Sequence, residues 1–271
     1  MKNILNFSAI EQVKQITKRM YELGWDERNG GNVSILLDEL ELNDYIDTNN
    51  IIREIPLDFD AKELANKIFL VTSTGSYFRK IIENPEELLG IFRISTTGDK
   101  ALLLWGYKNN NRFTSELPTH MLVHSSRLKV DSNHRVVMHC HPVNLLIMTH
   151  VHELNDKSFT LSLWRTMTES IVVFPEGVGA LPWMQSGTSE IGIATADKMQ
   201  TYRLVLWGLH GVHAVGNTID DAFGLIEVAE KSAQIYMGMQ NQPLINSISN
   251  AQLLNIAQFY KLKKVNYKFL E

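Results

Sequence analysis

Apolar residues recur along the chain in two periods, which together predict a mixture of helices and strands. Residues 8–24 show the helical period, with Ser8 and Glu11 spaced as a capping box and Gly24 at the end. The expected buried face of this helix is one apolar stripe: Ile10, Val13, Ile16 and Met20. Further helices are expected after Pro118, as a pair between 142 and 169, from about 188, over 218–238 with Thr218 as the cap, and over 250–261.

Strands are predicted where β-branched and aromatic residues cluster. Residues 89–95 and 101–107 form a predicted hairpin, and 135–141 form a strand that Pro142 stops. Another strand is predicted directly after Gly31. Four more are predicted over residues 67–73, 170–175, 203–208 and 210–216. Residues 38–66 are acidic and weakly patterned, so we expect an irregular surface segment there.

These elements alternate to the end of the chain without a repeat, a low-complexity tract or a linker rich in proline and serine. The pattern therefore predicts one α/β domain over residues 1–271. The order of the strands in the sheet does not follow from the pattern.

Charge and composition narrow the classes of function. The chain has 26 basic and 30 acidic side chains and a net charge of −4, without a lysine and arginine run, so nucleic acid is not an expected partner. It shows no signal-peptide pattern and no 18-residue uncharged apolar run, so we expect a cytoplasmic protein without a membrane partner. The single cysteine, Cys140, fits a reducing compartment and is expected to be buried and structural.

Two His-x-His pairs stand close together in the segment "VVMHCHPVNLLIMTHVH". His139 and His141 end a predicted strand, where the period of two puts both rings on one face and within reach of one ion. His150 and His152 end a predicted helix, where positions i and i+2 point about 200° apart. The second pair is therefore expected to be structural or exposed.

A catalytic zinc ion takes three protein ligands and keeps one open position, so a third ligand has to come from elsewhere. The segment "VLWGLHGVHAVG" offers His210 and His213, and His210 lies between a strand and a glycine turn. A rival zinc set is spaced i, i+4, i+8 near the start of the helix predicted after Pro118: Glu116, His120 and His124. Pro118 counts against the rival because it puts Glu116 before the first full turn, so spacing favours the strand set and leaves the other open.

Five segments, in order from about residue 20 to 235, carry a resemblance to a known family: "GWDERNGGNVS", "TSELPTH", "VVMHCHPVNL", "VVFPEGVGALPWM" and "LVLWGLHGVHAVG". Together they resemble the zinc-dependent class II aldolase and adducin-head superfamily, and in particular its rhamnulose group. The resemblance implies a three-layer α/β/α domain with a central mixed, largely antiparallel sheet, assembled as a homotetramer. It also implies reversible cleavage of L-rhamnulose 1-phosphate, in L-rhamnose catabolism, to dihydroxyacetone phosphate and L-lactaldehyde through a zinc-stabilised enediolate.

Site residues can be carried over from the family by motif. The implied ligands of one Zn²⁺ per subunit are His139, His141 and His210. Glu116 of "TSELPTH" becomes the catalytic base, and His120 and His124 become ordinary helix residues. Glu169 of "MTESIVVF" matches a family position that faces the metal, as a proton donor or relay at the aldehyde oxygen.

The substrate phosphate is expected among three loops of small residues, whose N–H groups and hydroxyls can bind an anion. The resemblance places six residues around it: Asn29, Asn32, Thr74, Gly75, Thr114 and Ser115. The middle loop reads "TSTGSYF", where glycine-serine-glycine is commoner in the family, so its individual donors are not fixed by the motif.

Two other functions compete with this one. A sibling aldolase or 4-epimerase, acting on L-fuculose 1-phosphate or L-ribulose 5-phosphate, would use the same metal chemistry. A non-catalytic module of the adducin-head type would keep the fold without the metal. The presence of the three histidines and Glu116 favours an enzyme over such a module.

Overall fold

The computed structural model describes residues 1–271, and nine strands form one sheet in the order β2-β5-β4-β3-β1-β6-β9-β8-β7. The strands are β1 (Asn32–Leu36), β2 (Arg53–Pro56), β3 (Ile68–Thr72), β4 (Leu89–Ile94), β5 (Lys100–Gly106), β6 (Val136–Cys140), β7 (Gly179–Leu181), β8 (Leu204–Trp207) and β9 (Gly211–Gly216). Only β7 and β8 pair in parallel. The expected mixed, largely antiparallel sheet is confirmed.

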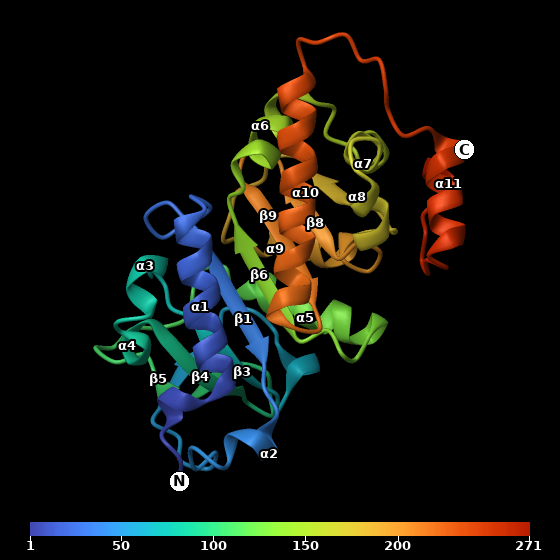
Figure 1. Ribbon diagram of the computed structural model, residues 1–271. Helices are drawn as coiled ribbons and strands as arrows, with labels where there is room; N and C mark the ends of the chain where they lie inside the picture. The colour runs from blue at the N-terminus through green and yellow to red at the C-terminus, as the bar shows by residue number, and fades with distance from the viewer.

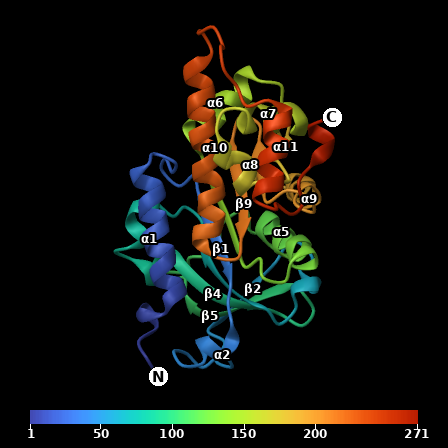
Figure 2. The same cartoon turned by 45° about the vertical axis from the view of Figure 1, so that its right-hand side comes forward.

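Helices cover both faces of the sheet, which gives three layers (Figure 1). They are α1 (Ser8–Glu22), α2 (Glu39–Leu42), α3 (Phe78–Ile81), α4 (Pro85–Leu88), α5 (Leu117–Val130), α6 (Val143–Val151), α7 (Asp156–Trp164), α8 (Thr168–Val173), α9 (Ser189–Lys198), α10 (Ile219–Met239) and α11 (Asn250–Phe259). Figure 2 shows α1 and α10 on one side of the sheet and α5 and α9 on the other. None of these helices is long and apolar enough to cross a bilayer.

Successive residues of β6 face the two outer layers in turn, as the pleat of a strand requires. Met138 packs into the larger core cluster with Ile226 of α10, whereas Val137 belongs to a smaller cluster with Val123 of α5. The free thiol of Cys140 lies in the larger cluster and is buried, as expected. Alternation along this strand therefore separates Cys140 from the face on which its neighbours stand.

Most elements follow their patterns, and the stripe of α1 is buried throughout. The predicted capping box is wrong, however. Ser8 is already the first helical residue and Phe7 is the N-cap, without a side-chain hydrogen bond. Glu11 instead binds Lys14, with 2.6 Å between carboxylate and ammonium.

Two predicted segments differ from the structure. Residues 170–175 are not a strand, because Thr168–Val173 form α8. Their β-branched run is too short to show a period, and packing on α10, where the hydroxyls of Ser170 and Ser232 lie 2.6 Å apart, decides the conformation. Residues 38–66 are not wholly irregular: they contain α2 and the edge strand β2, whose side chains alternate between partly buried and exposed.

A buried carboxylate on α10 fixes the start of α6, the helix that follows β6 directly. Glu230 accepts hydrogen bonds from the backbone N–H of Asn144 at 2.9 Å, the side-chain amide of Asn144 at 2.7 Å and the backbone N–H of Leu145 at 2.9 Å. These N–H groups have no partner within the helix, so Glu230 acts as the cap that Pro142 cannot provide. The contact also holds the end of β6 in place.

We expect Glu230→Ala to lower the free energy of unfolding by about 2–3 kcal/mol, because it leaves buried donors without an acceptor. Denaturant unfolding followed by circular dichroism measures this change. Glu227→Ala, an exposed carboxylate one turn earlier on the same helix, is the control and should change stability little. Equal effects of the two substitutions would contradict the capping role.

Candidate metal centre

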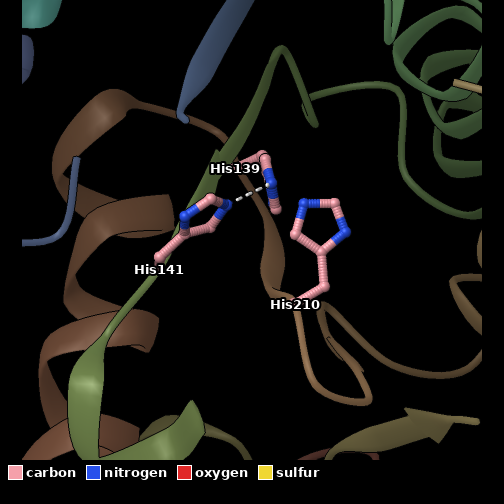
Figure 3. A group of neighbouring side chains, drawn as sticks. All are labelled: His139, His141 and His210. Carbon is pink, nitrogen blue, oxygen red and sulfur yellow. Dashed lines mark hydrogen bonds between the residues drawn. The ribbon is translucent and has the colours of Figure 1, made fainter. Parts of the chain in front are cut away.

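Three histidines converge at one end of the sheet (Figure 3). His139 is near the end of β6 and His141 follows it, and their Nε2 atoms lie 3.1 Å apart. His210 comes from the turn between β8 and β9, next to Leu209, whose φ of 61° bends the chain sharply. The three rings each offer a nitrogen, and these atoms lie within 4.8 Å of one another.

Each histidine of the strand pair uses its Nδ1 for a hydrogen bond, which leaves Nε2 for the centre of the group. Nδ1 of His139 donates to the carbonyl of Val212 at 2.8 Å, and Nδ1 of His141 donates to Glu27 at 2.6 Å. A carbonyl and a carboxylate can only accept, so in the neutral rings both Nε2 atoms carry lone pairs. Partners of this kind orient the histidine ligands of metal ions in proteins.

Burial keeps His139 and His210 neutral, which metal binding requires. Burial lowers the pKa of His139 well below its ordinary value, and nearby imidazoles lower it further. Burial also lowers the pKa of His210 to about 4, with a smaller effect from His141. At neutral pH both rings are therefore uncharged and able to bind a metal ion.

The arrangement fits one metal ion. Two lone pairs aimed at each other across 3.1 Å repel unless a cation lies between them. Two imidazole nitrogens on one tetrahedral zinc-sized ion stand about 3.3 Å apart, from bond lengths of roughly 2.0–2.1 Å. Two glycines leave room for the ring of His141. A Cβ at Gly211 would lie 2.6 Å from one carbon of that ring, and a Cβ at Gly30 would lie 2.7 Å from another, so a side chain at either position would displace the ring.

Glu116 lies beside this group as the N-cap residue of α5. Its Oε2 is 3.8 Å from Nε2 of His139 and accepts a hydrogen bond from the side-chain amide of Asn32 at 3.0 Å. Burial raises the pKa of Glu116 to about 7, although the bond from Asn32 acts in the opposite direction. Because the carboxylate precedes the first turn, as Pro118 indicated, it faces the histidines.

A second group of ligand atoms overlaps the first: Glu116, His139 and His213. His213 lies opposite His139 in the β6–β9 ladder, and their rings stack 4.3 Å apart. Both ring nitrogens of His213 are buried without a hydrogen-bond partner. This second group is wholly buried, whereas His141 and His210 of the first are partly exposed, so only the first offers an open side to a substrate.

The rival set on α5 is not brought together as a metal site. His120 and His124 are buried on one face of the helix, but they bind Ser34 of β1 through their ring nitrogens. Their hydrogen bonds also mean that they are not ordinary helix residues. The pair at 150 and 152 behaves as expected, because His150 is exposed and His152 binds the Ser162 hydroxyl at 2.8 Å.

The three predicted phosphate loops lie next to one another. The hydroxyl of Thr72 accepts from the N–H of Val33, which ties the first loop to the second, and the carbonyl of Thr72 accepts from the N–H of Thr114, which ties the second to the third. The exposed members of the three loops are Asn29, Gly75 and Ser115, while Thr74 is partly buried and Asn32 and Thr114 are buried. Gly75 has a φ of 66°, which suits its place in a tight turn.

Glu169 stands apart from this cluster. It is exposed in the first turn of α8, a helix that packs against α7, α10 and α11. Within one chain it has no hydrogen bond or ion pair with the histidines or Glu116. Its assignment stays a prediction.

Two acidic residues escaped the sequence analysis. Glu27 binds His141, and Asp26 accepts from the N–H of Gly31 at 3.2 Å behind the first loop. Burial raises the pKa of Asp26 to about 6. Both belong to "GWDERNGGN", but no spacing rule connects that segment with a histidine 114 positions away.

Comparison with known proteins gives concordant results. The family model for the class II aldolase and adducin N-terminal domain matches residues 11–237. A protein of Listeria monocytogenes serovar 1/2a named rhamnulose-1-phosphate aldolase is 49% identical over 93% of each chain. Another of that name, from Enterococcus faecalis, is 46% identical over 98% of this chain and 96% of its own.

Solved structures share the fold. A sugar-phosphate aldolase from Thermotoga maritima has a TM-score of 0.76 and 26% identity, covering 86% of this chain and 97% of that one. An L-fuculose 1-phosphate aldolase has a TM-score of 0.62 and 18% identity over 93% and 96% of the two chains, which compares the fold alone.

We expect His210→Ala to lose the bound metal ion, because two imidazoles with no third ligand hold it weakly. The metal-to-protein ratio after gel filtration, measured by mass spectrometry of the elements, tests this. His150→Ala removes an exposed histidine outside the group and should keep the ratio of the parent protein. A metal-replete His210→Ala would show that the ion lies elsewhere.

We expect Glu27→Gln to weaken metal binding roughly 10- to 100-fold, because the amide is a poorer acceptor for Nδ1 of His141. Competition with a chromogenic chelator measures the affinity. The control for lost surface charge is Glu83→Gln, which alters an exposed carboxylate before α4. The same affinity in both variants would exclude Glu27 as the partner that orients His141.

Proposed function

We propose that this protein reversibly cleaves L-rhamnulose 1-phosphate. The chain belongs to the class II aldolase and adducin N-terminal domain family, and it is an aldolase like its relatives of 41–49% identity. The products would be dihydroxyacetone phosphate and L-lactaldehyde. The observation that carries this proposal is the convergence of three imidazoles beside the buried carboxylate of Glu116. This arrangement also favours an enzyme over a metal-free scaffold.

Zinc is the proposed ion, held by the three histidines of the first group. Three neutral nitrogen ligands suit Zn²⁺ and leave its full charge for a substrate. When bound, the ion would act as a Lewis acid on the sugar oxygens and stabilise the negative charge that develops as the carbon–carbon bond breaks. Glu27 and the carbonyl of Val212 hold two of the rings in the orientation that this needs.

Glu116 is the proposed acid and base. In the synthetic direction its carboxylate takes a proton from the hydroxymethyl carbon of dihydroxyacetone phosphate, and in the cleavage direction it returns that proton. Its raised pKa, near 7, is matched to a group that both accepts and donates a proton near neutral pH. The bond from Asn32 holds one carboxylate oxygen, so the other is free to reach the carbon.

The phosphate is proposed to bind where the three small-residue loops meet. Backbone N–H groups and hydroxyls of the residues around Asn29, Thr74 and Ser115 would bind the phosphate by hydrogen bonds, in place of the lysine and arginine side chains that other phosphate sites use. Ser115 lies just before the N-terminus of α5, a position that favours an anion. The net charge of −4 is therefore no obstacle to a phosphorylated substrate.

We propose that the enzyme works in the cytoplasm as a homotetramer, as the resemblance implies, with residues 1–271 as one class II aldolase-like domain. Glu169 is exposed in the first turn of α8 and has no hydrogen bond or ion pair with the histidines of its own chain. Its proposed role as a proton donor or relay would therefore serve the site of a neighbouring copy.

The second candidate function is that of a sibling enzyme acting on L-fuculose 1-phosphate or L-ribulose 5-phosphate. The fuculose aldolase structure shares this fold at 18% identity, whereas proteins named for the rhamnulose substrate reach 49%. The identity favours the rhamnulose sugar.

We expect L-rhamnulose 1-phosphate to be cleaved faster than L-fuculose 1-phosphate, in an assay that couples dihydroxyacetone phosphate to NADH oxidation. Removal of metal by a chelator should abolish the rate, and added zinc should restore it, because the ion stabilises the charge of the transition state. Faster cleavage of L-fuculose 1-phosphate would change the assigned substrate but leave the proposed mechanism unchanged. Chelator-resistant cleavage would refute the role of the metal.

We expect Glu116→Gln to lower kcat by about 10²- to 10⁴-fold while the protein keeps its metal, since the amide cannot take the proton. Glu190→Gln, in the first turn of α9, is an exposed control for the same chemical change. Undiminished turnover by Glu116→Gln would show that Glu116 is not the catalytic base.

A further inference from the structure

A row of buried polar side chains runs between β1 and α5, next to the proposed base. Asn32 and Ser34 are two positions apart on β1, and so stand on one face of the strand. His120 and His124 are four residues apart on α5, which places both on one side of the helix, and Glu116 is the N-cap residue that precedes its first turn. The two sets of side chains meet with almost no exposure to solvent, between 0% and 7%.

Hydrogen bonds join these five side chains into one chain. Asn32 donates to Glu116 at 3.0 Å through Nδ2, so its Oδ1 faces Nε2 of His120, with which it is hydrogen-bonded. Nδ1 of His120 lies 2.6 Å from the hydroxyl of Ser34, which lies 2.8 Å from Nε2 of His124. The chain ends at Nδ1 of His124, which has no partner.

The chemistry of the groups assigns each proton. A carboxylate only accepts and an amide oxygen only accepts, so Nε2 of His120 must carry hydrogen. Burial lowers the pKa of His120 to about 3 and that of His124 well below the ordinary value, so each ring is neutral with a single N–H. Nδ1 of His120 is therefore an acceptor from Ser34, and Ser34 in turn accepts from Nε2 of His124. Every bond points toward Glu116.

We propose that Ser34, His120 and His124 are positioning residues that fix the Asn32 amide, and through it the carboxylate of Glu116, for the aldol reaction. Without His120 the Asn32 amide could rotate and turn its oxygen toward the Glu116 carboxylate. The two oxygens would then repel each other. The chain makes that rotamer unfavourable because a reversed amide would set Nδ2 against the N–H of His120. The inference rests on the proposed function for the role of Glu116.

The row is neither a metal site nor a proton wire. Both ring nitrogens of His120 are engaged in hydrogen bonds, so neither is free for an ion. An amide does not readily pass protons on, since transfer through Asn32 would need its imidic acid form. The chain therefore sets geometry and leaves proton transfer to Glu116 itself.

Ser34→Ala tests the positioning role, because it removes the hydroxyl between the two imidazoles. We expect kcat for L-rhamnulose 1-phosphate to fall roughly 10- to 100-fold from misorientation of the base, with KM and bound metal little changed. Ser34→Thr keeps the hydroxyl and should recover most of the rate. An unchanged kcat in Ser34→Ala, or an equal loss in the threonine variant, would overturn the proposal.

Neutron diffraction from deuterated crystals of the parent protein gives a test that needs no variant to fold and no substrate. It should show deuterium on Nε2 of both His120 and His124, with none on either Nδ1. Deuterium on Nδ1 of His120 would overturn the chain of bonds. Failure of the proposed function would appear separately, as a parent protein that cleaves no sugar phosphate while the deuterium positions still stand.

Discussion

The pairing of β6 with β9 is the constraint on which the centre depends. It sets His139 directly opposite His213 and brings the turn that carries His210 to the end of β6, which His141 follows. The strand pleat then keeps both members of the His-x-His pair on one side and sends Cys140 into the opposite layer. A shift of this register by one residue would exchange the two faces and dissolve the group.

The sequence pattern predicts those elements whose conformation is determined by interactions between residues close in the sequence. The stripe of α1, the hairpin of β4 and β5 and the paired histidines follow from periods of 3.6 and 2. The short helix α8 does not, because its β-branched run is too short to show a period and its packing on α10 is a contact that the pattern does not reveal. The candidate metal ligands were accessible from spacing combined with family resemblance, and the structure brings the same three residues together as a group that could hold an ion.

The residues that form hydrogen bonds with the candidate ligands could not be predicted from the sequence. Glu27 and His141 are 114 positions apart, and nothing in either segment announces the other. The same holds for Ser34, which lies 86 and 90 positions from the two histidines that it joins. Such contacts exist only after the sheet has formed, so a single sequence cannot reveal them. The resemblance likewise gave His120 and His124 no role, since family motifs record the residues that touch substrate or metal more readily than those that support them.

The sheet is open, and its two edges differ from the strands between them. At one edge β7 has three residues, and at the other β2 carries Arg53, Glu54 and Pro56. Short edges, charges and a proline without an N–H all discourage another strand from adding on. Copies of this chain should therefore associate through helices and loops and not by continuing the sheet, and the same edges protect the folded protein against amyloid-like stacking.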